Sequence, residues 1–244
     1  MVSDDTFSVL ILVDYDNLSD DHKRSGILSL ITKALSHLPK SISATLGTCE
    51  VRIYGGWYEE ALMTHLAQDV SIRIQEEFPA IIKIPLSEGR LIQFRTNAEL
   101  AFALYQEPSH HLFNTFRKKA VPSNIRFAKP LDVGCTNSSC ILHLAKKLLQ
   151  KNKCPIDTCS TTSCELVYRH EQKIVDTMLT CDLIYASQSN SNIHIMLVSN
   201  DDDFLPPIRT ALLNGSQIYR LHPKHRLQIQ QQTGIGTRLT ELEL

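Results

Sequence analysis

Continuous apolar runs and helical repeats alternate along the chain. The runs over 7–13 and 193–198 contain few polar residues, which is typical of strands buried on both faces of a parallel sheet. Ser87-Glu88-Gly89 separates two other strand-like runs and predicts a hairpin turn. The expected strands are 7–13, 50–54, 81–85, 90–95, 193–198 and 216–221.

Between these runs, apolar residues recur every three or four positions and predict helices. The expected helices are 22–38, 58–69, 140–151, 166–187 and 204–213, and the tail 222–244 has too weak a period to assign. Residues 106–165 are rich in loops and cysteine. This order predicts an open, mainly parallel α/β sheet with helices on both faces and a Cys-rich insertion in the middle.

Composition narrows the classes of protein that fit this pattern. The 244 residues carry a net charge of −1, which argues against nucleic-acid binding by bulk charge alone and leaves room for a local basic patch. No apolar run approaches the roughly 20 residues of a membrane span. The N-terminus lacks the basic start of a signal peptide, so we expect a cytoplasmic protein that does not act in a membrane.

Two of the apolar runs end in clusters of acidic residues. Asp14 and Asp16 follow the first run, and 201–203 (Asp-Asp-Asp) follow the run over 193–198. Ligands of open α/β sheets bind at the carboxyl ends of the strands, where both clusters would lie. Gathered carboxylates repel one another and select hard cations such as Mg²⁺ or Mn²⁺, which suits phosphoryl chemistry. Taken alone, each cluster would also fit a helix N-cap or a solvated loop.

Three segments resemble the signature segments of NYN domains, the PIN-like, LabA-type members of a nuclease superfamily. ILVDYDNL (11–18), KIVDTMLTCDLI (173–184) and VSNDDDFLPPI (198–208) occur in the order of the family. The third segment departs from the family pattern at Asn200 and Asp202, where glycine is usual. The resemblance implies a single PIN-like NYN domain over 1–244, with the unmatched insertion over 106–165 inside it.

The resemblance implies a Mg²⁺- or Mn²⁺-dependent endoribonuclease, with RNA as its partner. The implied catalytic metal ligands are Asp14, Asp176, Asp201 and Asp203. Asn17 would orient a ligand or the substrate phosphate. Lys173, one helical turn before Asp176, would hold a phosphate or tune the carboxylates. Asp182 also matches the motif, but it does not share a helix stripe with Asp176 and ranks as secondary.

Three other functions stay open at this point. The first is an RNA-binding or regulatory module that keeps the fold without cleaving, which the complete set of repelling carboxylates disfavours. The second is a DNA or flap nuclease. The carboxylates alone would also suit a metal-dependent phosphatase. The sequence does not indicate an oligomeric state.

Five of the seven cysteines fall within 135–164. Four thiolates can close a tetrahedral zinc site, and a metal would order a segment that lacks a core of its own. The natural four are Cys135, Cys140, Cys154 and Cys159, with Cys164, His143 or His170 as substitutes. Unrelated free thiols, or a disulfide after oxidation, are the alternative.

Basic residues gather in two parts of the sequence. Arg117, Lys118 and Lys119 form a basic stretch in the insertion, and Arg220 and Lys224 lie near the last expected strand. Such residues can contact the phosphates of a nucleic acid. For any single residue, a solvated surface position is the alternative.

Overall fold

The structure is a computed structural model that describes residues 6–120, 128–137, 139–172, 174–189, 193–225 and 238–244. The chain divides into two compact units. The main unit comprises Met1–Phe116 and Gln172–Leu244, and the second unit comprises Arg117–Glu171. The Cys-rich segment expected over 106–165 overlaps the second unit.

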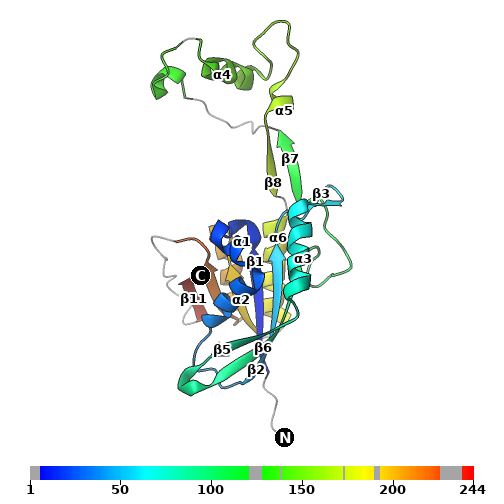
Figure 1. Ribbon diagram of the computed structural model, residues 1–244, viewed down its shortest axis with the longest axis vertical. Coiled ribbons are helices and arrows are strands. Elements are labelled where there is room, and N and C mark those ends of the chain that lie inside the picture. The colour runs from blue at the N-terminus through cyan, green and yellow to red at the C-terminus, as the bar shows by residue number, and fades with distance from the viewer. Residues whose placement is uncertain (1–5, 121–127, 138, 173, 190–192, 226–237) are drawn as a thin grey trace. The chain divides into compact units, whose positions relative to one another are not determined.

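A seven-stranded sheet in the order β11-β10-β9-β1-β2-β6-β5 forms the centre of the main unit (Figure 1). Neighbouring strands run parallel, except that β5 and β6 form an antiparallel hairpin around the turn at Ser87–Gly89. This arrangement confirms the predicted open, mainly parallel α/β sheet. The strands are β1 (Phe7–Asp14), β2 (Leu46–Tyr54), β5 (Ala80–Pro85), β6 (Leu91–Leu100), β9 (Ile193–Val198), β10 (Gln217–His222) and β11 (Leu239–Glu243).

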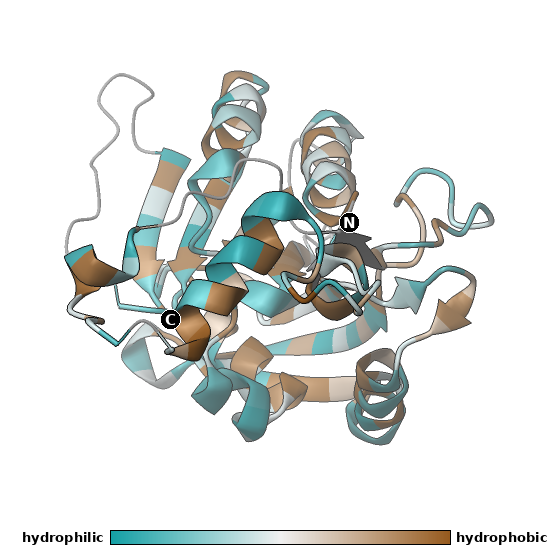
Figure 2. Ribbon diagram, turned by 90° about the horizontal axis from the view of Figure 1, so that it is seen from above, coloured by the Kyte–Doolittle hydropathy of each residue, from teal (hydrophilic) through white to brown (hydrophobic). Residues whose placement is uncertain are grey.

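Helices cover both faces of this sheet, and β1 contributes to both cores. Val9, Ile11 and Val13 pack on the side of α2 and α3, whereas Leu10 and Leu12 pack on the side of α6 and α7. Because both faces are buried, β1 is a continuous apolar run. α2 is amphipathic, since its buried residues recur every three or four positions. Hydrophilic and hydrophobic residues occur within the same helices in Figure 2. Their bounds are α1 (Asp20–Ser25), α2 (Ile27–Ser36), α3 (His65–Glu77), α6 (Val175–Ser189) and α7 (Leu205–Leu213).

Two expected helices have different bounds in the structure. The helix expected over 22–38 is split at Gly26, whose φ of +87° favours glycine. The helix expected over 58–69 begins late. Its first part forms a short hairpin of β3 (Tyr58–Glu59) and β4 (Leu62–Met63), and α3 begins only after the N-cap Thr64, whose hydroxyl accepts from the Ala67 N–H.

The helix expected over 166–187 is also wrong in its first part. Tyr168–Gln172 form strand β8, and α6 begins at Val175. Ile174, just before the helix, has a φ of +59°, which is strained for a β-branched residue and interrupts the helical backbone. The unassigned tail contains β11, a parallel edge strand beside β10.

The second unit contains short elements with little core. They are β7 (Phe116–Ala120, which begins in the main unit), the 3₁₀ helix η3 (Pro130–Val133), α4 (Ile141–Lys151), α5 (Ser163–Leu166) and part of β8. No residue of α4 is buried. Over the described ranges of both units, no helix has the length and apolar character needed to cross a membrane.

The central position of β1 makes a stability prediction. Ile11→Ala removes a fully buried side chain and should lower the free energy of unfolding by about 2–5 kcal/mol, measured by chemical denaturation. Ile81→Ala, at a strand position with 61% exposure, is the matched control and should change it by less than about 0.5 kcal/mol. Equal losses in the two variants would contradict the central role of β1.

Candidate functional site

The two acid clusters meet where the strand order reverses. β1 and β9 are parallel neighbours, with Val13 opposite Val198, so their carboxyl ends lie at one edge. The chain leads from β1 to β2 on one side and from β9 to β10 on the other. Such a switch point is the common ligand-binding position of open α/β sheets. Asp14 ends β1 there, and Ser199 directly follows β9.

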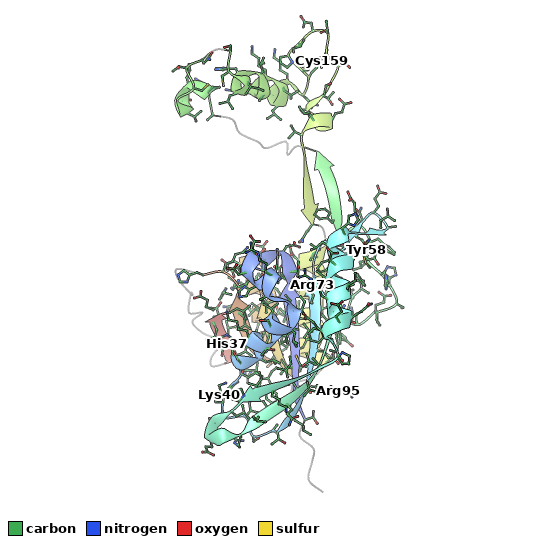
Figure 3. All side chains as sticks on the ribbon, in the orientation of Figure 1. His37, Lys40, Tyr58, Arg73, Arg95 and Cys159 are labelled. Atoms are coloured by element: carbon green, nitrogen blue, oxygen red, sulfur yellow. The ribbon has the colours of Figure 1, made fainter. Side chains whose placement is uncertain are left out.

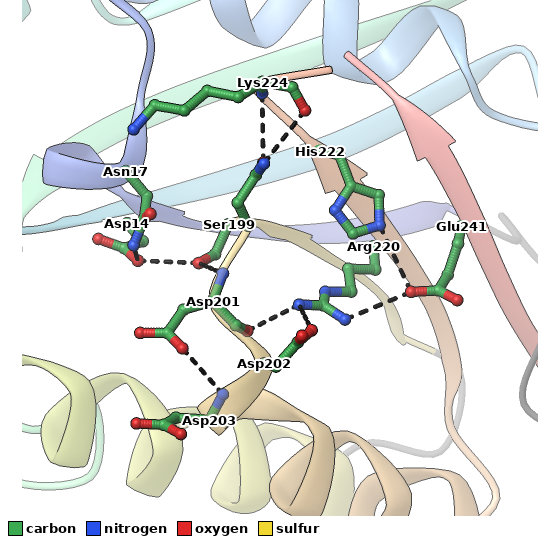
Figure 4. Close-up of polar contacts among 11 residues, drawn as sticks. Asp14, Asn17, Ser199, Asp201, Asp202, Asp203, Arg220, His222, Lys224 and Glu241 are labelled. Carbon is green, nitrogen blue, oxygen red and sulfur yellow. Dashed lines mark hydrogen bonds and ion pairs between the residues drawn. The ribbon is translucent and has the colours of Figure 1, made fainter. Parts of the chain in front are cut away.

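Asp14 is the buried member of the site. Its Oδ2 accepts a hydrogen bond from the Ser199 hydroxyl at 2.8 Å and another from the Asn17 side-chain amide (Figure 4). The short 3₁₀ helix η1 (Tyr15–Asn17) turns the chain back so that Asn17 reaches Asp14. Burial raises the pKa of Asp14, the two hydrogen bonds oppose this shift, and the charge of Asp201 adds to it.

A chain of hydrogen bonds continues from Ser199 to the second acid cluster. The Ser199 hydroxyl accepts from the Asp201 N–H at 3.0 Å. Asp201 caps the 3₁₀ helix η4 (Asp202–Phe204), since its Oδ1 accepts from the Asp203 N–H at 2.9 Å. Phe204 is buried beneath this turn, which fixes the turn to the core. The ends of β1 and β9 are therefore joined by polar contacts.

Asp176 brings a third segment to the site. It lies in the first turn of α6 and is exposed, yet its pKa is raised to about 6. Partial desolvation is the largest cause, and nearby carboxylates contribute the rest. In decreasing order these neighbours are Asp14, Asp201, Asp203 and Asp16. The structure thus places the four acidic residues that the sequence predicted as metal ligands near enough for their charges to interact.

Asp16 and Lys23 lie at the same edge of the sheet. Desolvation raises the pKa of the Asp16 carboxyl, the positive charge of Lys23 lowers it, and the charge of Asp14 raises it again. A hydrogen bond to the backbone of Gly56 also lowers it. The Lys23 ammonium lies 5.3 Å from the ring centre of Tyr15. The acidic site therefore has a cationic neighbour on α1.

Arg220 is the residue that sequence reasoning misplaced. It was expected at a surface that contacts phosphates, but its side chain is 1% exposed. Its guanidinium donates to the Asp201 carbonyl oxygen at 2.7 Å and to Asp202 Oδ1 at 3.1 Å. The available signal was a charged residue within the apolar run 216–221, which indicates a buried pair as readily as a surface contact.

Several other expected residues lie elsewhere. Asp182 is buried away from the acid clusters, where its carboxylate accepts from the Tyr54 hydroxyl and the Tyr105 N–H, both at 2.7 Å, and lies 3.5 Å from Arg52 Nε. Lys173 lies outside the described residues. The basic residues Arg117, Lys118 and Lys119 belong to β7, whose side chains beyond Phe116 are likewise not described.

The acid clusters have the donor chemistry of a hard-cation site. All their side-chain donors are carboxylate oxygens, and a cation would relieve the repulsion that, after desolvation, contributes to the raised pKa of Asp176. Among the described residues, however, no three His, Cys, Asp or Glu side chains already form a group that could hold a metal ion. Mg²⁺ retains several waters and commonly binds one or two carboxylates directly, so donors of this type at wider spacing suit it.

Four of the five cysteines of the second unit form two pairs. Cys135 contacts Cys140, and Cys154 contacts Cys159. Cys159 lies in the loop before α5 (Figure 3). The thiol of Cys159 also donates to Thr161 Oγ1, and these contacts with Thr161 lower its pKa. Between the pairs lies α4, whose 11 residues span about 16 Å. The four predicted zinc ligands therefore lie in two separate pairs.

Comparison with known proteins assigns neither a family nor a function to the chain. No protein-family model matches the chain. Significant matches are also lacking among curated proteins and among solved structures.

The raised pKa of Asp176 predicts how stability depends on pH. A carboxyl with a raised folded-state pKa holds its proton more tightly in the folded than in the unfolded chain. Without metal, the fold should therefore gain stability as the pH falls from 7 through about 6 toward the ordinary value of 3.8. Removing the charge by Asp176→Asn should stabilise the metal-free protein at pH 7 and flatten this dependence.

Thermal unfolding in EDTA at pH 7 and pH 5 measures both effects. The exposed position of Asp176 limits the gain at pH 7 to about 1 kcal/mol, or about 2–4 °C in Tm. Asp21→Asn, which removes a carboxylate with 92% side-chain exposure on α1, is the control and should follow the wild type. Parallel pH profiles for wild type and Asp176→Asn would show that the carboxylates do not interact.

Proposed function

We propose that this protein is a PIN-like nuclease of the NYN type that cleaves RNA phosphodiester bonds with Mg²⁺ or Mn²⁺. The observation that carries the proposal is the junction of the acid clusters that end β1 and β9, where Ser199 links Asp14 to the backbone of Asp201. The pKa of the nearby Asp176 carboxyl is raised to about 6, in part by these carboxylates. Carboxylates that repel one another at a topological switch point favour a cation at that point. The three sequence segments that resemble NYN domains support the same function.

The residues of the site would have distinct roles. Asp14, Asp176, Asp201 and Asp203 would hold the ion, which when bound neutralises a substrate phosphate and lowers the pKa of a bound water. Asn17 and Ser199 orient the Asp14 carboxylate through their hydrogen bonds. Because Asp14 is buried and Asp176 is exposed, an RNA phosphate would approach from the side of Asp176.

An RNA-binding module without cleavage is the alternative, and a DNA or flap nuclease is a further one. The site disfavours the first, because the four gathered carboxylates would repel a phosphate backbone unless a cation neutralised them. Nothing in the acid clusters distinguishes ribose from deoxyribose. The experiment below therefore includes both nucleic acids.

Cleavage should require both the metal and the carboxylates. With Mn²⁺ present, the wild-type protein should cut single-stranded RNA, and EDTA should abolish the reaction. Asp176→Asn and Asp14→Asn should each lower kcat/KM by at least about 100-fold, because each removes a charge that stabilises the transition state through the metal. Asp157→Asn, at an exposed carboxylate of the second unit, is the control and should cleave like the wild type. Gel analysis of end-labelled RNA and DNA gives the rates.

The outcomes separate the candidate functions. Cleavage of DNA in preference to RNA would favour the DNA nuclease. Retained RNA binding without cleavage, in the presence of Mn²⁺, would favour the non-catalytic module. Equal cleavage by the wild type and both Asp→Asn variants would show that a contaminant is responsible.

Structural zinc in the second unit is a proposal of its own. We propose that thiolates of Cys135, Cys140, Cys154 and Cys159 bind Zn²⁺, which would order a unit whose longest helix buries no residue. The seven cysteines are free thiols in the structure, which suits a reducing compartment, and we propose the cytoplasm as the location.

Metal content tests the zinc proposal. Protein purified under reducing conditions should contain one Zn²⁺ per chain by elemental mass spectrometry. The double variant Cys135→Ser/Cys140→Ser should lose it, because removing two thiolates leaves too few ligands for a closed site. Cys49→Ser, at a buried thiol of β2, is the control and should retain zinc. A zinc-free wild type, or zinc retained by the double variant, would contradict the proposal.

A further inference from the structure

Arg220 occupies a position in the sheet where an apolar residue would be expected. It lies on β10, with Leu197 of β9 on one side and Glu241 of β11 on the other. Ile218, two residues earlier on the same face, belongs to the core that packs under α6 and α7. A guanidinium buried in such a core is costly unless its donors are paired. Its partners therefore indicate why a charge is placed there.

Two of these partners belong to the turn that carries the second acid cluster. Arg220 Nη2 donates to the Asp201 carbonyl oxygen at 2.7 Å and to Asp202 Oδ1 at 3.1 Å. Nη1 donates to Glu241 Oε1 at 3.4 Å, across the register pair of β10 and β11 (Figure 4). Arg220 thus ties the turn after β9 to the edge strand.

The turn points its side chains in two directions. Asp202 turns toward Arg220, whereas the carboxylates of Asp201 and Asp203 turn away from it (Figure 4). The charges of those two carboxylates contribute to the raised pKa of Asp176. Holding the backbone of Asp201 and the side chain of Asp202 therefore sets the direction of both neighbouring carboxylates.

We propose that Arg220 is a positioning residue of the acidic site: it fixes the turn 201–203 so that Asp201 and Asp203 face Asp14 and Asp176. This role rests on the proposed function of these carboxylates as the ligands of a divalent cation. Glu241 holds the guanidinium from the opposite side and balances its charge. The edge strand β11 thereby contributes to the site without reaching it.

The geometry of the contacts requires arginine. One guanidinium donates to a carbonyl oxygen and to two carboxylates that lie on different sides of it. Lysine has a single ammonium on a flexible stem and does not reproduce such a planar fork. Arg220→Lys should keep the buried charge and the fold while loosening the turn.

The test compares Arg220→Lys with Arg90→Lys. Arg90 also donates to a backbone carbonyl, that of Ile42 at 3.1 Å, but it follows the turn between β5 and β6, at the opposite edge of the sheet.

In Arg220→Lys, amide hydrogen exchange at Asp201 and Asp203 should be about tenfold faster without metal, with the amides of β1 unchanged. The Kd for Mn²⁺ should rise about 10-fold or more, as expected when a residue that orients a ligand is lost. RNA cleavage should lose kcat with little change in KM. Arg90→Lys should change none of these.

A milder variant covers the case in which Arg220→Lys does not fold. Asp202→Asn weakens one contact of Arg220 and leaves its contact with Glu241 in place. The Asp202 side chain is 53% exposed, so the substitution is mild. It should show the same changes at smaller size. Unchanged exchange at 201–203 in the folded variants, or faster exchange spread evenly over the sheet, would overturn the positioning role.

The outcomes also separate this inference from the proposed function. If the wild type neither binds Mn²⁺ nor cleaves RNA, the proposed function fails, and with it the functional part of this inference; the exchange rates still decide whether Arg220 fixes the turn. If Mn²⁺ binds with the same Kd in wild type and Arg220→Lys although the turn exchanges faster, the positioning role fails while the metal site stands.

Discussion

The burial of the Asp14 carboxyl is the constraint on which the rest of the site depends. A carboxylate removed from water at the end of the central strand needs hydrogen-bond donors, and Asn17 and Ser199 supply them. The need for these donors determines the path of the chain in both segments that contribute them. The chain must turn back after β1, and Ser199 must follow β9 at the adjacent strand end. Since Ser199 also binds the Asp201 N–H, the position of the second acid cluster follows from the first.

The sequence predicted the parts of the fold whose burial leaves a simple pattern. β1 and β9 are apolar along their length because helices cover both faces, and strand-end acids could be assigned to one edge for that reason. The start of α3 depends on the Thr64 cap, and the start of α6 follows a strained Ile174, so periodicity misplaced both. Arg220 was misplaced because its partner Glu241 lies on β11, an edge strand with weak periodicity. The charge within the run 216–221 was a local signal, but it did not identify the distant segment that Arg220 contacts.

The second unit buries much less apolar surface than the main unit. The main unit has two apolar cores on the two faces of one sheet, and a unit of this size can bury enough surface to be stable without disulfides. In the second unit, α4 buries no residue, and large apolar side chains such as Ile141 are 75% exposed. A unit with so little buried apolar area would need other interactions to be ordered, and the proposed binding of zinc by its paired thiols would supply them.

The position of Arg220 explains why the carboxylates at this edge are not neutralised by its nearby positive charge. Arg220 carries a positive charge close to the turn, but it pairs with Asp202 and Glu241, on the side away from the carboxylates of Asp201 and Asp203. It therefore holds the turn without neutralising the carboxylates that face Asp176. Two things can then relieve their repulsion: protons, as the raised pKa of Asp176 indicates, or a bound cation. Because the two would compete for the same oxygens, a cation bound at this edge would release protons, and we expect its binding to strengthen as the pH rises through about 6.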